Sequence, residues 1–336
     1  MIGRFLKMKL GIIGAGSIVP FHLDALITVG FVPDCIAARA KSQRARDLAK
    51  LYNIPEVLSS AREVIEKDLD ALLIAPASDA LEELVPIIVK RRLPTLIEKP
   101  VFLNKFDMNV NASRKDAHVM VGYNRRFYDS VQKLKNYIDV HTSGFFRFTV
   151  PELSSNHNPT FEDVTNTIRN NTVHALDLVE FLFKPRNFAI TDLGTGSSSI
   201  FGPLLIDYSS EHFVGSVTVT FGSPANYKLE VFQPGAYLSL SPLETYAKFD
   251  QMAVLEPTPE TPLRRYVPIS SSPTEVSQHD IKFKPGFLLQ AHALKKLVEH
   301  QKDVNAASLS EALRAAQLAN ELVETLRASL KSLPQK

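Results

Sequence analysis

The chain has 336 residues, more than a single domain usually contains, so we expect two domains. Hydrophobic residues make up 45%, charged residues 22%, and the formal net charge is +2, which gives no reason to expect a nucleic-acid or membrane partner. A single cysteine excludes an internal disulfide and no apolar run approaches a membrane span, so we expect a soluble cytoplasmic protein.

The first third of the chain alternates short apolar runs with amphipathic stretches. The apolar runs are Met8–Ile13, Asp34–Ala38, Ala71–Pro76, Thr95–Glu98 and His118–Gly122. Helical patterns over Ser42–Tyr52 and Ala80–Val89 lie between them, and Pro86 should kink the second or shift its start. This alternation predicts βαβ units and a parallel sheet, and therefore a Rossmann-type α/β domain over residues 1–124.

From about residue 144 the pattern changes to strands separated by turns. The predicted strands are Phe145–Val150, Phe188–Leu193, Leu204–Tyr208, Val214–Thr220, Tyr227–Phe232 and Tyr237–Leu240. One helix, Thr167–Phe183, interrupts them, and residues 256–285 resemble a long loop. We expect an α+β domain over residues 125–285 with a large, mostly antiparallel, open sheet. Residues 286–336 are helical, with a capping box at Ser308 and Glu311.

The turn Gly14-Ala15-Gly16 joins the first strand to the first helix. The first glycine permits a tight bend, and the second lets the backbone approach a pyrophosphate at the helix N-terminus. Val19 stands where the pattern has a third glycine. A turn of this kind also occurs without a ligand, but the succession of strand, turn, helix and further βαβ units favours a nicotinamide dinucleotide site.

The end of the second predicted strand distinguishes the two nicotinamide cofactors. An acidic residue there holds the ribose 2′-hydroxyl of NAD, whereas an arginine accommodates the 2′-phosphate of NADP. The strand ends in Arg39, and Asp34 lies at its other end. We interpret Arg44 or Arg46 as part of a solvated helix face. The pattern favours NADP over NAD, with NAD as the alternative.

Glu98-Lys99-Pro100 stands at the end of the fifth predicted strand. Strand ends in such a sheet face the ligand crevice, although a lysine in an arbitrary turn would simply be solvated. With this motif the chain resembles the Gfo/Idh/MocA family, named for glucose–fructose oxidoreductase, inositol dehydrogenase and a rhizopine-catabolism protein. The motifs are GIIGAGSI at 11–18, DALLIAPAS at 70–78, IEKP at 97–100, VGYNRRF at 121–127, HALD at 174–177 and HFVGSVTVTFG at 212–222.

The resemblance implies an enzyme that oxidises or reduces a CH-OH group of a sugar, inositol or nucleotide sugar with NAD(P). It also implies C-terminal helices that return towards the Rossmann domain. Lys99 would be the active-site lysine and His174 the general acid–base, with Asn170 beside it. Cofactor-binding residues would be Gly14, Gly16, Ser17, Ile18, Arg39, Ala75, Pro76, Glu98, Lys99 and Asn124. Substrate-binding residues would be Lys99, Arg126, Asn170, His174 and Asp177.

The helical spacing places Asn170, His174 and Asp177 on one face. A histidine near neutral pKa suits removal of the hydroxyl proton during hydride transfer, and a lysine can polarise the same oxygen. Asn170 stands where many members carry an aspartate, so the partnership with His174 is open. Ala75 and Ala80 likewise replace a threonine and a histidine common in the family. We expect no metal site, because the nine histidines are scattered and no HExxH occurs.

Three functions remain possible at this point. The leading one is an NADP-preferring oxidoreductase for a carbohydrate-like alcohol or ketone. The others are a non-catalytic NAD(P)-binding sensor or regulator, and an enzyme that recycles a permanently bound dinucleotide. Because an open sheet face usually needs covering, we expect a homodimer or homotetramer. Specificity should reside on the sheet face and in loops such as 151–168.

Overall fold

The computed structural model describes residues 7–39, 41–76, 78–102, 118–140, 143–153, 159–194, 201–272 and 276–332. Residues 154–158, within the segment predicted to carry specificity, are outside these ranges. The chain forms two compact units. The first contains residues 1–128 and 279–319, and the second contains residues 129–278 and 320–336.

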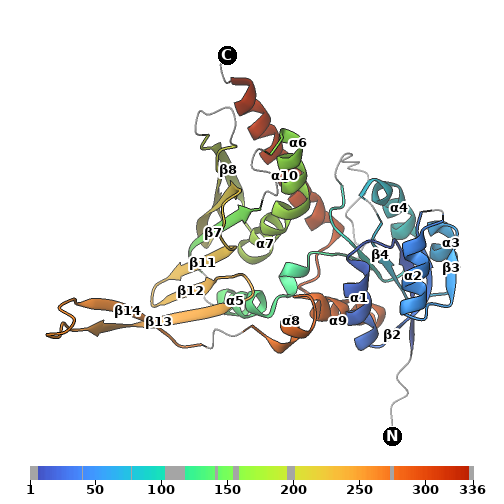
Figure 1. The fold of residues 1–336 in the computed structure, drawn as a ribbon, viewed down its shortest axis with the longest axis horizontal. Coiled ribbons are helices and arrows are strands. Elements are labelled where there is room, and N and C mark those ends of the chain that lie inside the picture. Colours follow the sequence, from blue (N-terminus) through green and yellow to red (C-terminus); the bar gives the residue numbers. More distant parts are fainter. Residues whose placement is uncertain are drawn as a thin grey trace, which may run out of the picture. The chain divides into compact units, whose positions relative to one another are not determined.

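A parallel sheet of six strands forms the centre of the first unit, in the order β3-β2-β1-β4-β5-β6. Figure 1 labels β2, β3 and β4 of this sheet. The strands are β1 (Met8–Ile13), β2 (Phe31–Ala37), β3 (Glu56–Leu58), β4 (Ala71–Ile74), β5 (Thr95–Ile97) and β6 (Val119–Val121). All four residues of β4 are buried, because helices cover both faces of such a sheet. The strand order reverses between β1 and β4, the point at which open α/β sheets bind ligands. The predicted Rossmann fold is confirmed.

The first unit also contains helical segments, several of which share a core with this sheet. They are α1 (Val19–Thr28), α2 (Gln43–Leu51), α3 (Ala61–Glu66), α4 (Ser78–Arg91), η2 (Asn124–Phe127), α8 (Gln278–Lys282), α9 (Phe287–Val298) and the first half of α10 (Leu309–Ser332). Helix α4 begins before Pro86 and continues through it. The predicted capping box opens α10: Glu311 N donates to Ser308 Oγ at 3.3 Å, and Ser308 N donates to Glu311 Oε2 at 2.9 Å.

An eight-stranded sheet forms the second unit, in the order β14-β13-β12-β11-β7-β10-β9-β8. The strands are β7 (Gly144–Glu152), β8 (Asn187–Asp192), β9 (Leu204–Ser209), β10 (Phe213–Phe221), β11 (Lys228–Gln233), β12 (Ala236–Leu240), β13 (Tyr246–Leu255) and β14 (Arg265–Ser270). Among the described strand pairs of this eight-stranded sheet, only β7–β10 is parallel. The predicted large, mostly antiparallel sheet is therefore confirmed.

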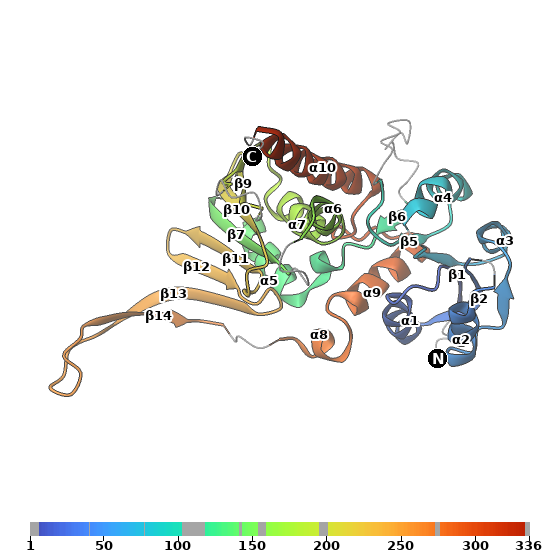
Figure 2. The same cartoon turned by 45° about the horizontal axis from the view of Figure 1, so that its top comes forward.

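Helices cover one face of this sheet. Figure 2 shows α5 (Asp129–Val140), α6 (Phe161–Thr167) and α7 (Val173–Phe183) on the same side of the strands. Side chains of alternate β7 residues face them, and the rings of Phe146 and Phe183 stack with their centroids 4.0 Å apart. Phe148 is also fully buried. The inner face thus supplies the hydrophobic core of the second unit.

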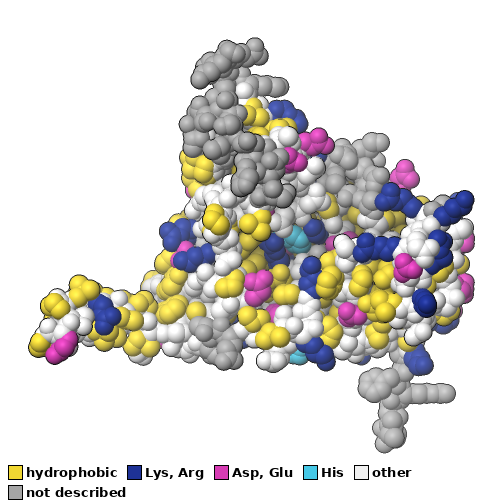
Figure 3. Space-filling view, viewed as in Figure 1, with side chains coloured by type: hydrophobic (Ala, Val, Ile, Leu, Met, Phe, Trp, Pro, Cys, Tyr) yellow, Lys and Arg dark blue, Asp and Glu magenta, His cyan; other side chains and the backbone are white. Residues whose placement is uncertain are grey.

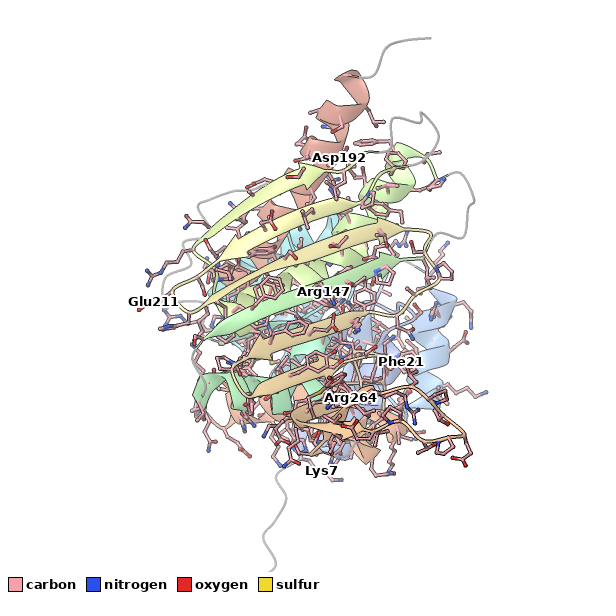
Figure 4. All side chains as sticks on the ribbon, turned by 90° about the vertical axis from the view of Figure 1, so that its left-hand side faces the viewer. Lys7, Phe21, Arg147, Asp192, Glu211 and Arg264 are labelled. Atoms are coloured by element: carbon pink, nitrogen blue, oxygen red, sulfur yellow. The ribbon has the colours of Figure 1, made fainter. Side chains whose placement is uncertain are left out.

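The other face of the sheet is open. Figure 4 shows the strands in front of the helices, with Arg147 on the face towards the viewer. Phe145, Val214 and Phe232 on this face are 43%, 53% and 38% exposed. Alternation of buried and exposed residues along β7 and β10 produces these two faces.

The prediction of a long loop over residues 256–285 is wrong. Strand β14 and helix α8 lie within that range, and β14 pairs with β13 at the edge of the sheet. Pro268 obscures β14 in the sequence, because proline is normally excluded from strands except at an edge. Every residue of β14 is exposed, and Figure 3 shows hydrophobic side chains along this hairpin.

Candidate functional site

The glycine turn after β1 is closed by backbone contact. Gly14 has a φ of +107°, and a Cβ atom at this position would lie 2.1 Å from the carbonyl oxygen of Ala75. Only glycine adopts this conformation and permits this approach. The turn therefore holds the end of β1 against the end of β4, at the point where the strand order reverses.

The second glycine faces open space. A Cβ atom on Gly16 would lie 3.8 Å from the nearest described atom beyond its two chain neighbours, the carbonyl oxygen of Ala75, so there is room beside Gly16 for the pyrophosphate of a dinucleotide. Ile18, at the N-cap of α1, makes no side-chain capping hydrogen bond. The N–H of Val19 donates to the carbonyl oxygen of Gly16 at 3.1 Å, and Pro20 has no N–H, so the positive end of the helix dipole and few free N–H groups remain for an anion here. Val19, in place of the third glycine, is fully buried.

A cavity of about 580 Å³ lies beside this turn. Its lining residues are Ile13, Gly14, Ala15, Gly16, Ala37, Ala38, Arg39, Ser42, Arg44, Ala61, Ala75, Pro76, Ala80 and Leu84. Five predicted cofactor residues are among them: Gly14, Gly16, Arg39, Ala75 and Pro76. Ser17, Ile18, Glu98, Lys99 and Asn124 are not. The residues therefore fit a dinucleotide, with an arginine where its adenosine ribose is expected.

Two arginines, rather than one, line this cavity. Arg44 lies in the lining together with Arg39, so the solvated-face interpretation applies to Arg46 alone. Arg46 donates to the Gln43 side chain and to the carbonyl oxygen of Lys41. Asp34, the acidic residue of β2, pairs instead with Lys67 at 3.2 Å. No acidic side chain is among the cavity's described lining residues.

Glu98, which the resemblance assigns to the cofactor, belongs to a buried pair. Its Oε1 lies 2.6 Å from Nε2 of His22 on α1, and its Oε2 accepts a hydrogen bond from the backbone N–H of Lys99 at 3.1 Å. The Phe287 ring packs on the imidazole, with centroids 4.5 Å apart. The pair links the helix that follows the glycine turn to the strand end that carries Lys99. Sequence reasoning missed His22, because 76 residues separate it from Glu98.

Asn124 and Arg126 make structural contacts inside the first unit. The Asn124 amide donates to the carbonyl oxygen of Pro285 at 3.0 Å. Arg126 is 1% exposed, and its Nη1 donates to Oε1 of Glu311 at 3.0 Å. Burial by itself would raise the pKa of Glu311, but Arg126 and hydrogen bonds from Ser308 hold that pKa below its ordinary value. These contacts anchor α10 within the first unit, and the substrate contact that the resemblance implies for Arg126 stays a prediction.

The helix that carries His174 is not a regular α-helix. A π-helical segment, η3 (Ile168–Thr172), separates α6 from α7. Asn170 lies in it, is exposed, and donates to the carbonyl oxygen of Asn166 at 2.9 Å. His174 and Asp177 lie in α7 and are buried. The three residues thus differ in exposure, and the shared face stays a prediction. π segments often occur at functional sites.

A second cavity, of about 520 Å³, lies beside η3 in the second unit. Its lining residues are Pro151, Glu152, Leu153, Asn166, Thr167, Asn170, Asn171, Ala225, Asn226 and Tyr227. Asn170 therefore lines a pocket, whereas His174 and Asp177 are not among its lining residues. The substrate-binding roles of all three residues stay predictions. Glu152 was missed. The signal was available, because Glu152 continues the buried alternation of Phe146, Phe148 and Val150 along β7.

Two classes of feature are absent from the described part of the chain. No group of three His, Cys, Asp or Glu side chains there is placed to hold a metal ion. None of the described helices has the length and apolar character needed to cross a membrane.

Comparisons with known proteins identify relatives of part of this chain. Residues 8–141 match the family described as an oxidoreductase family with an NAD-binding Rossmann fold. Myo-inositol 2-dehydrogenase of Thermotoga maritima is 27% identical over 141 residues, which cover 41% of this chain and 42% of that protein. The chain spans about half the length of the curated relatives it matches.

Two solved structures have the same fold along nearly the whole chain. UDP-N-acetylglucosamine 3-dehydrogenase GnnA from Acidithiobacillus ferrooxidans matches with a TM-score of 0.72 and 15% identity, covering 97% of this chain and 99% of that one. Levoglucosan dehydrogenase, in complex with NADH and levoglucosan, matches with a TM-score of 0.71 and 15% identity, covering 96% and 97%. At these identities the likeness concerns the fold.

Proposed function

We propose that this protein is an NADP-preferring oxidoreductase acting on a carbohydrate-like alcohol or ketone. The match of residues 8–141 to the Gfo/Idh/MocA oxidoreductase family supports this reaction class. The preference for NADP over NAD is proposed because Arg39 and Arg44 both line the cavity after β2. Guanidinium groups bind a phosphate through charge-assisted hydrogen bonds. The likeness to named sugar and inositol dehydrogenases supports the reaction class.

Three parts of the first unit would hold the dinucleotide. Gly14 and Gly16 would permit the close backbone approach, the N-terminal end of α1 would face the pyrophosphate, and Arg39 with Arg44 would bind the 2′-phosphate. A bound nicotinamide dinucleotide would supply the acceptor or donor of a hydride at the substrate carbon. The side chains of this protein would transfer the hydroxyl proton.

Lys99 and His174 are the groups proposed to act on the substrate oxygen. The lysine ammonium donates a hydrogen bond to that oxygen and stabilises negative charge on it. The His174 imidazole takes the hydroxyl proton during oxidation and returns it during reduction. The buried pair of Glu98 with His22 holds the backbone of Lys99 and so positions this lysine. The sensor alternative is not favoured, because the named relatives are dehydrogenases.

Calorimetric titration with NADPH and NADH tests the cofactor assignment. We expect the unmodified protein to bind NADPH more tightly, by about 10-fold to 100-fold, the usual contribution of a hydrogen bond to a charged group. Arg39→Asp should shrink or reverse this preference. Arg46→Asp is the matched control, because Arg46 lies outside the cavity lining and should leave both affinities unchanged. Tighter binding of NADH to the unmodified protein would contradict the assignment.

A further inference from the structure

His22 lies in the first turn of α1, and its imidazole is buried inside the first unit. The residue is 2% exposed, and its backbone N–H donates to the carbonyl oxygen of Ile18 at 3.3 Å. The Phe287 ring of α9 packs on the imidazole with centroids 4.5 Å apart, and Figures 1 and 2 both show α9 beside α1. Helix and ring together restrict the rotamers of His22, so its Nε2 has a defined direction.

That nitrogen orients the Glu98 carboxylate. Nε2 lies 2.6 Å from Oε1 of Glu98, and because a carboxylate can only accept, Nε2 is the nitrogen that donates. The other oxygen, Oε2, accepts the backbone N–H of Lys99 at 3.1 Å. Glu98 is 8% exposed, so its carboxylate would need another donor if the imidazole were lost. His22 therefore also determines where the acceptor for the Lys99 N–H lies.

A narrow slot leaves the carboxylate little choice of position. Gly122, directly after β6, forms one wall: a Cβ atom there would lie 3.0 Å from Oε1 and 3.3 Å from Cα of Glu98. The backbone of Glu98 is held as well, because its N–H donates to the carbonyl oxygen of Ile74 in β4 at 2.8 Å. A displacement of the His22 imidazole must therefore displace the carboxylate with it.

The helix that carries His22 begins at the proposed dinucleotide site. α1 starts at Val19, and the turn of Gly14 and Gly16 precedes it. An anion at this terminus would interact with the positive end of the helix dipole. Because an α-helix turns once in about 3.6 residues, an adjustment of the first turn to that anion reaches His22 directly. One side chain thus connects the place where a dinucleotide would bind with the backbone of Lys99.

We propose that His22 is a positioning residue that couples dinucleotide binding at the start of α1 to the placement of Lys99. The inference rests on the proposed function, because it takes from it the site of the dinucleotide and the role of Lys99. NADPH orders the first turn of α1, the imidazole transmits this order to Glu98, and Glu98 holds the Lys99 N–H more firmly. Such a coupling is reciprocal, so NADPH affinity and order at Lys99 depend on each other by the same factor.

Hydrogen exchange of the Lys99 amide measures the coupling without any substrate. We expect saturating NADPH to slow this exchange by about 10-fold in the parent, a coupling of ordinary size. His22→Leu removes the donor, so NADPH should change the exchange by less than about twofold, and reciprocity limits the loss of NADPH affinity to about 10-fold. His22→Gln keeps an N–H donor and should restore most of the effect. His292→Leu, at an exposed histidine of α9, is the matched control.

Turnover gives a second readout. NADP reduction is assayed with myo-inositol and with glucose, at a temperature where circular dichroism shows every variant to be folded. His22→Leu should lower kcat by about 10-fold to 100-fold, since a small misplacement of a reacting group costs that much, with a smaller change in the KM for substrate. His22→Gln should recover most of kcat. A purely structural role would lower stability and leave kcat of the folded variant at the parent value.

Gly122→Ala keeps the test decisive if His22→Leu does not fold. It crowds the Glu98 carboxylate by a few tenths of an ångström while His22 stays in place, so it should weaken the NADPH effect on Lys99. An NADPH effect that is absent from the parent, or that keeps its full size in these two variants, would overturn the proposal.

The outcomes separate this coupling from the proposed function. The expected exchange pattern without NADP reduction by any alcohol tested would count against the oxidoreductase activity and leave the coupling intact. Parental exchange and parental kcat in His22→Leu would refute the coupling and leave the oxidoreductase activity intact.

Discussion

Replacing Arg126 with methionine should destabilise the first unit without altering the chemistry. Methionine fills the space of the alkyl chain but leaves the Glu311 carboxylate, 29% exposed, without its cation. Breaking a buried ion pair costs about 3–5 kcal/mol. Because Glu311 keeps its hydrogen bonds from Ser308 and reaches solvent, we expect a loss of about 2–4 kcal/mol. In a domain of this size the Tm should fall by roughly 5–15 °C.

The effect should depend on pH in a defined direction. Glu311 has an ordinary pKa of 4.5, and Arg126 helps to hold its folded-state pKa below that value. A carboxyl whose pKa is lowered by folding contributes stability above its unfolded pKa, and this contribution is lost as the pH falls through the lowered value. The stability difference between Arg126→Met and the parent should therefore be largest at neutral pH and shrink below about pH 4.

Urea and thermal unfolding of four proteins measure this coupling: the parent, Arg126→Met, Glu311→Gln and the double variant. Arg46→Met controls for loss of an exposed guanidinium and should change the free energy of unfolding by less than about 0.5 kcal/mol. A parent-like stability of Arg126→Met, or additive single effects in the double-mutant cycle, would refute the reasoning. If Arg126→Met had unchanged stability and a raised KM for substrate, the result would support the substrate contact that the family resemblance implies for Arg126.

Two further predictions concern activity and assembly. Lys99→Ala and His174→Ala should each lower turnover by about 100-fold or more, the usual size of acid–base effects, with little change in NADPH affinity; full activity in both variants would contradict the proposed roles. On the open sheet face, aromatic rings are in contact from Phe145 through Phe232 and Tyr237 to Phe249. We therefore expect the protein to form a dimer or tetramer through this face. Light scattering that reports a monomer at micromolar concentration would refute this expectation.

The parallel sheet could be predicted because burial on both faces leaves a plain signal. β1 and β4 are nearly continuous apolar runs, and the glycine turn follows the first of them. β14 gave no such signal: it is an edge strand, all of its residues are exposed, and Pro268 interrupts it. β3, with three residues, is too short for periodicity to reveal.

The candidate sites were predictable only where one motif contains the chemistry. Gly14 and Arg39 could be identified because the turn and the following strand end have local patterns. His22 could not, since its partner is determined by the packing of α1 on the sheet. The π segment was equally hidden, because helical periodicity assumes a constant rotation for each residue. The hydrogen bond from Asn171 to the Glu152 carboxylate therefore became visible only in three dimensions.

The π segment also has a consequence for how the pocket beside it can change. Each residue of an α-helix turns the chain by about 100°, so one residue more or less in a helix normally rotates every side chain beyond it out of place. A wider π turn absorbs such a residue locally. The amides that face the pocket can thus differ in number and direction while the buried side of α7, with His174 and Asp177, keeps its phase against the sheet. Substitutions or insertions in this segment can therefore change the shape of the pocket without changing the packing of α7 in the core.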